Sequence, residues 1–60
     1  MEEAIKKLEE KNFHVCNQFD GWTGTETGKY ELWGETFKSK NELLLDNLNE
    51  AQVIALANIL

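Results

Sequence analysis

The sequence predicts a small α+β domain: an N-terminal helix, an antiparallel β-hairpin or three-stranded meander, and one or two C-terminal helices packed on the sheet. Three observations support this fold class. Residues 2–11 have apolar side chains at helical spacing, residues 13–37 contain alternating runs broken by glycines, and residues 41–60 hold most of the aliphatic side chains. A chain of 60 residues corresponds to one domain, residues 1–60.

The first predicted element is an amphipathic helix over residues 2–11. Ala4, Ile5 and Leu8 form one narrow apolar stripe among charged residues. Asn12 suits the left-handed conformation that ends a helix. A helix of about ten residues is not stable in isolation, so this one is expected to lie on a sheet.

Two strands are predicted next, over Phe13–Phe19 and Lys29–Phe37. Asp20 and Gly21 form a dipeptide typical of the tightest hairpin turns. The segment that follows is rich in Gly and Thr, which indicates a loop, although Trp22–Thr25 could pair as a third short strand.

One glycine interrupts the second predicted strand. Gly34 indicates a bulge or bend. Because a bulge moves the following side chains to the other face of the sheet, the buried face of Lys29–Phe37 stays open.

The residues before the last helix allow two interpretations. Ser39 and Glu42 have the spacing of a capping box, which favours a short helix from Lys40 to about Asn47. A rival interpretation is a strand over Glu42–Leu48, because the leucines at 43–45 form a short apolar run and periodicity alone cannot separate the two.

A second helix start is predicted at Asn49, with Gln52 completing a capping box and Leu48 forming a hydrophobic staple with Val53. The helix from Glu50 onward is apolar around most of its circumference and therefore needs cover on several sides. This surplus predicts a partner protein, or a homodimer through this helix. The expected interface residues are Val53, Leu56, Ala57 and Leu60.

The charge excludes several classes of partner. The chain has 11 acidic residues, six lysines and no arginine, with a net charge of -5. Nucleic-acid binders need cations along the phosphates, and anionic membranes repel such a chain, so neither partner is expected. The charge favours another protein with a basic surface. The single cysteine fits a reducing compartment, and with no signal-peptide pattern at the start we expect a cytoplasmic protein.

Candidate chemistry is sparse, and no enzyme, cofactor or metal is expected. His14 and Cys16 share a strand face, but zinc needs four ligands and the chain has no second His or Cys. The segment GTETGKY at residues 24–30 lacks the phosphate-loop pattern, which requires Gly where Thr23 stands and Ser or Thr where Tyr30 stands.

The aromatic residues give the clearest functional signal. Trp33 and Phe37 are expected to fill the core, whereas Trp22, beside the glycine-rich segment, fits either a core position or a binding hot spot. The candidate partner-binding residues are Trp22, Glu26, Tyr30, Glu31 and Glu35.

Together these features predict a small acidic protein-binding module, of inhibitor or adaptor type, that acts by occluding a surface. Two alternatives remain. The first is a DNA-mimic inhibitor of a nucleic-acid-binding protein, in which carboxylates stand in for phosphates. The second is a structural homo-oligomer without catalytic activity.

Overall fold

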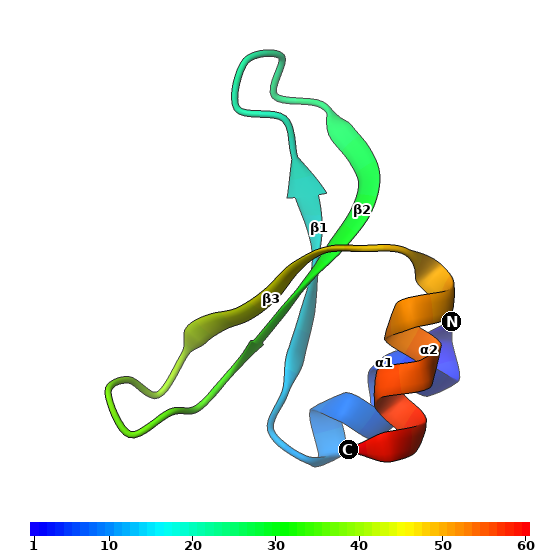
Figure 1. The fold of residues 1–60 in the computed structure, drawn as a ribbon, viewed down its shortest axis with the longest axis vertical. Helices are drawn as coiled ribbons and strands as arrows, with labels where there is room; N and C mark the ends of the chain where they lie inside the picture. The colour runs from blue at the N-terminus through cyan, green and yellow to red at the C-terminus, as the bar shows by residue number, and fades with distance from the viewer.

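The computed structural model describes residues 1–60 and confirms the α+β fold class. Its elements are α1 (Glu2–Glu10), β1 (His14–Phe19), β2 (Glu26–Gly34), β3 (Glu42–Leu48) and α2 (Glu50–Ile59). The strands form one antiparallel sheet in the order β1-β2-β3. In Figure 1 the helices lie next to each other on one side, and the β1–β2 and β2–β3 connections project away from them.

The first helix forms and ends as its sequence predicts. Ala4 and Leu8 from the apolar stripe are buried. Asn12 adopts the left-handed conformation with a φ of 67°, and the next amide, of Phe13, donates to the Leu8 carbonyl at 2.9 Å. This stop turns the chain from α1 into β1, so the helix packs beside the strand that follows it.

The β1–β2 hairpin is present, but its turn is longer than the two-residue turn expected at Asp20 and Gly21. The Asp20 amide donates to the Thr25 carbonyl at 2.9 Å, and the Gly24 amide donates to the Asp20 carbonyl at 2.8 Å. Gly24 has a φ of 68°, a conformation that glycine adopts without the steric cost of a Cβ. Trp22–Thr25 is therefore a turn and not a third strand.

The third strand is β3, and the expected helix from Lys40 to Asn47 was wrong. Ser39 does not cap a helix: its hydroxyl donates to the Asn41 carbonyl and accepts from the Asn41 amide, both at 3.3 Å. Glu42 accepts a hydrogen bond from the Thr36 hydroxyl. Because an isolated two-stranded hairpin is marginally stable, pairing the leucine run along β2 completes a sheet that a short helix would leave unfinished.

Strand β3 contains two irregularities in its register. Tyr30 pairs with Leu48 and Leu32 with Leu45, so three steps along β3 match two steps along β2. Asn47 lies in this bulge with a φ of 55°. The bulge that was expected at Gly34 in β2 lies instead in β3, the strand that pairs with it. Because paired residues share a face, the bulge places Leu45 and Leu48 on the same face as Leu32.

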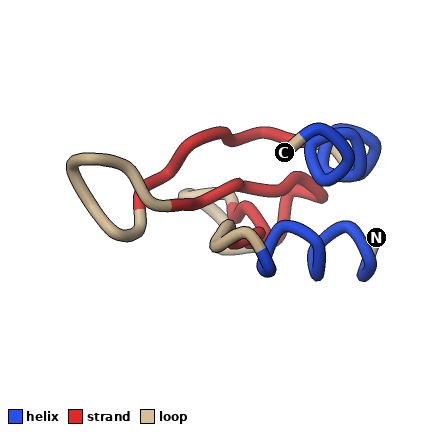
Figure 2. Tube along the Cα trace, turned by 90° about the horizontal axis from the view of Figure 1, so that it is seen from below, coloured by secondary structure: helices blue, strands red, loops and turns tan.

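The core lies between the two helices and this face of the sheet. Its buried apolar residues are Ala4, Leu8, Leu32, Leu48, Val53 and Ala57. Phe13, Val15, Tyr30 and Leu56 are partly buried against them. Figure 2 shows α1 and α2 at two different levels at the same end of the molecule. The Cα atoms of the whole chain span 32 × 27 × 13 Å.

Two aromatic residues expected in the core are not part of it. Trp33 is half-buried but belongs to the opposite face from Leu32, because neighbouring side chains alternate along a strand. Phe37 is 96% exposed, because β2 ends at Gly34 rather than continuing to residue 37.

Helix α2 begins as predicted. The Asn49 side chain accepts from the Gln52 amide at 2.8 Å, and the Gln52 side chain accepts from the Asn49 amide at 2.8 Å. Leu48 and Val53, the predicted hydrophobic staple, are both buried. The capping box thus starts the helix directly after β3 and turns it toward α1.

Candidate binding surfaces

The hairpin tip, residues 20–26, presents a tryptophan to solvent on a turn with its own hydrogen bonds. Trp22 is 98% exposed. Its backbone amide donates to the Asp20 carboxylate at 2.7 Å, an arrangement in which an Asp side chain mimics a turn of backbone. The hydroxyls of Thr23 and Thr25 are 2.7 Å apart. These bonds shape the backbone of the turn, and the indole itself extends into solvent without contact to the core.

The hairpin tip is also acidic. Asp20 and Glu26 are its only charged residues, and the nearest lysine in the sequence is Lys29. The Glu26 carboxylate accepts a hydrogen bond from the side-chain amide of Asn17 at 3.2 Å. The exposed indole therefore lies on a turn that carries two carboxylates and no cation.

A second exposed aromatic lies at the β2–β3 connection. The Thr36 hydroxyl accepts from the amides of Lys38 and Ser39 at 3.1 and 3.3 Å. The Lys38 ammonium lies 5.7 Å from the centre of the Phe37 ring, within the range of a cation–π contact. Figure 1 places this connection and the hairpin tip at separate extremities of the molecule, so the two aromatics do not form one site.

The sheet face opposite the core, which we call the open face, surrounds Trp33. Trp33 lies between His14 on β1 and Leu43 on β3. Its indole N–H donates to the Glu31 carboxylate at 3.2 Å. These neighbours account for the partial burial of Trp33 on a face that no helix covers.

The open face also carries His14 and Cys16, the pair considered for thiol or metal chemistry. Both residues are exposed, and Cys16 is a free thiol. No group of three or more His, Cys, Asp or Glu side chains in the chain is placed to hold a metal ion.

The five candidate partner-binding residues do not form one surface. Trp22 and Glu26 share the hairpin tip. Tyr30 is half-buried against the core, on the helix-bearing face of the sheet. Glu31 lies on the open face, and Glu35 is exposed just beyond the end of β2.

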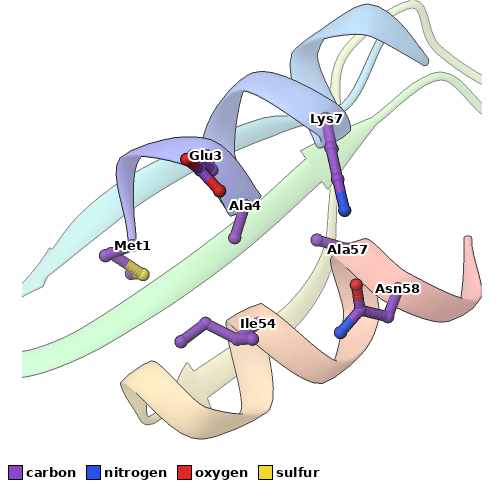
Figure 3. A pocket seen from close by; sticks show the side chains of 7 residues that line it. All are labelled: Met1, Glu3, Ala4, Lys7, Ile54, Ala57 and Asn58. Carbon is purple, nitrogen blue, oxygen red and sulfur yellow. The ribbon is translucent and has the colours of Figure 1, made fainter.

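Two hollows flank α2. The hollow between α1 and α2 has a volume of about 260 Å³. Figure 3 shows the small side chains of Ala4 and Ala57 on the facing helices, with Glu3 and Lys7 at its edge. The second, which we call the α2–β3 groove, has a volume of about 300 Å³. Its lining residues are Leu45, Leu48, Gln52, Ala55, Leu56 and Ile59.

The structure places the candidate interface residues of α2 at different depths. Val53 and Ala57 are 1% and 5% exposed and belong to the protein's own core. Leu56 is half-buried, and Leu60 is 38% exposed. The largest aliphatic exposure on the helix is at Ile59, at 76%. Ile59 was not among the expected interface residues, although its spacing from Gln52, Ala55 and Leu56 places it on the same side of the helix as they are.

None of the helices combines the length and apolar composition needed to cross a bilayer. Comparisons with models of protein families, with curated proteins and with solved structures found no match to the chain.

Proposed function

We propose that the protein is a binding module of inhibitor or adaptor type, which occludes a surface of another protein through its hairpin tip. The observation that carries this proposal is the 98% exposure of Trp22. Tryptophan is among the residues most enriched at binding hot spots. Because the indole makes no contact with the core, a partner can cover it without disturbing the fold.

The charge of the tip defines the chemistry of the partner. Asp20 and Glu26 flank the indole, and the whole chain has a net charge of -5. Complementary charge raises association rates and selects against wrong partners. The partner is therefore a protein with an apolar pocket for the indole, bordered by lysine or arginine side chains.

The carboxylates give less support to the DNA-mimic alternative. A mimic needs its acidic groups along one surface, in place of a row of phosphates. The Glu26 carboxylate accepts a hydrogen bond from the Asn17 side chain. Asn17 pairs with Tyr30, which faces the helices, so Glu26 is on that side of the sheet. Glu31 lies on the open face. Carboxylates on opposite faces of the sheet support a DNA mimic less than a single acidic surface would.

The exposed, unpaired thiol of Cys16 supports action in a reducing compartment, for which we propose the cytoplasm. The proposed mechanism needs no catalytic group, because binding at the tip covers the partner's surface by itself.

The test compares three immobilised proteins: the unmodified chain, Trp22→Ala and Phe37→Ala. Trp22 and Phe37 are both almost fully exposed on loops, so Phe37→Ala is the matched control. We expect one stoichiometric partner to bind the unmodified chain and Phe37→Ala, with affinity for Trp22→Ala reduced by about 30-fold, equivalent to about 2 kcal/mol. Equal retention of the partner by Trp22→Ala, or recovery of no stoichiometric partner, would contradict the proposal.

A further inference from the structure

Helix α2 has a second, mostly apolar stripe that its own chain covers only in part. Val53 and Ala57 face the core. Gln52, Ala55, Leu56 and Ile59 follow the spacing i, i+3, i+4, i+7, which is typical of a helix face that packs on another element. All four line the α2–β3 groove.

The chain as a whole exposes more surface than a folded monomer of its size is expected to expose, and Trp22, Phe37 and Ile59 all contribute to that surface. The accessible surface is 4562 Å², whereas a folded monomer of 6.9 kDa is expected to expose about 4,000 Å². An interface that covered an area equal to this excess, roughly 560 Å² on each of two copies, would bury roughly 1,100 Å² in total, just above the ~1,000 Å² that a specific interface requires.

We propose that the α2–β3 groove is the interface of a homodimer, in which the α2 helices of two copies pack antiparallel across a two-fold axis near Ala55 and Leu56. With this axis, Ile59 of each copy lies against Gln52 of the other copy. Leu45 and Leu48 line the groove beside this contact. Ala55 is small enough to let the helices approach closely.

Two features of the groove favour a second copy over a different protein. First, a two-fold interface must be self-complementary, and this face has both a projecting side chain, Ile59, and the hollow that would receive it. Second, every residue that lines the groove is uncharged, in a chain whose net charge is -5. This is the part of the surface where two acidic copies can meet with least repulsion.

The helix dipoles favour the antiparallel arrangement. The last turn of α2 has no basic residue, so nothing within the chain compensates the negative end of its dipole. Antiparallel packing places this end beside the positive N-terminal end of α2 in the second copy. A parallel pair would bring the two negative ends together.

Sedimentation over a concentration series tests the proposal with a matched pair of variants. Ala51 and Ala55 are both exposed on α2, one turn apart, and only Ala55 lines the groove. We expect the unmodified protein and Ala51→Glu to reach twice the mass of 6.9 kDa at tens to hundreds of micromolar, and Ala55→Glu to stay monomeric. Circular dichroism checks that both variants are folded.

Salt dependence gives a second measurement. Because the interface is apolar and the copies repel each other, added salt should increase the dimer fraction by screening that repulsion. A monomeric unmodified protein at every concentration, a folded Ala55→Glu that dimerises as well as Ala51→Glu, or a dimer that dissociates when salt is added would each overturn the proposal.

Discussion

Replacing Gly34 with alanine should lower the free energy of unfolding by about 1–2 kcal/mol, although a glycine-to-alanine change stabilises proteins by about 0.4–1 kcal/mol wherever the native backbone accepts it. Gly34 is buried at the end of β2 and its φ is not positive. A Cβ there would lie 2.9 Å from Leu44 Cδ1 and 2.9 Å from Phe13 Cδ1. Overpacking of this kind costs about 1–3 kcal/mol, which outweighs the gain from a stiffer unfolded chain.

The two neighbours differ in how easily they can move. Leu44 is 36% exposed, so its methyl group can turn toward solvent. Phe13 is partly buried against the core, and its ring is in contact at a second atom, Cε1, at 3.2 Å. The Phe13 ring therefore decides whether Gly34→Ala stabilises or destabilises the fold, because the ring can move away from the new Cβ only by disturbing the core.

Thermal and urea unfolding measure the change. For a domain of this size 1 kcal/mol corresponds to a shift in Tm of about 4–8 °C, so Gly34→Ala should unfold roughly 5–15 °C lower. Gly21→Ala is the control, because its Cβ meets nothing within 4 Å, and its stability should be unchanged or slightly raised. In a Leu44→Ala background the loss caused by Gly34→Ala should shrink, because Phe13 can then move into the vacated space. Equal stability of Gly34→Ala and Gly21→Ala would refute this reasoning.

Three further predictions concern the core, the start of α2 and the hairpin tip. Leu8→Ala should cost about 2–5 kcal/mol, a large part of the ~3–9 kcal/mol expected for a domain of this length, so its circular dichroism should show substantial unfolding in mild urea. Asn49→Ala should cost about 1 kcal/mol through loss of the capping box, measurable as a lower urea midpoint, and Asn49→Asp should retain most of that stability. Amides in Asp20–Lys29 should exchange with deuterium faster than those of the rest of β2, and uniform protection across this segment would contradict its predicted mobility.

The helices and the first hairpin could be predicted because their signals are local. The α1 stripe, the left-handed stop at Asn12 and the reciprocal bonds of Asn49 and Gln52 each involve residues within a few positions of one another. The third strand could not be assigned from local signals. Ser39 and Glu42 have the right spacing for a helix cap. The leucine run becomes a strand because it pairs with the free edge of β2, which is not part of the local sequence.

The exposed aromatics show the same division between local and distant causes. Sequence composition suggested that Phe37 would fill the core, yet the chain leaves the sheet three residues earlier, and Phe37 lies in a connection held together by Thr36. The sequence left Trp22 open between a core position and an exposed one, and the structure exposes it because its glycine-rich surroundings offer an indole little to pack against. The open face around Trp33 depends on register, which the two irregularities in β3 make unreadable from sequence.

The two proposed surfaces are compatible with each other because they occupy different parts of the fold. The hairpin tip projects away from both helices (Figure 1), whereas the α2–β3 groove is formed by α2 and the strand that precedes it. Pairing through the groove would therefore leave Trp22 exposed on both copies, and the dimer would present two acidic tips. Two linked sites bind a partner with paired sites more tightly than either site alone, without any new contact. On that basis Ala55→Glu should retain binding to an isolated partner molecule while losing the extra affinity toward a dimeric or surface-immobilised one.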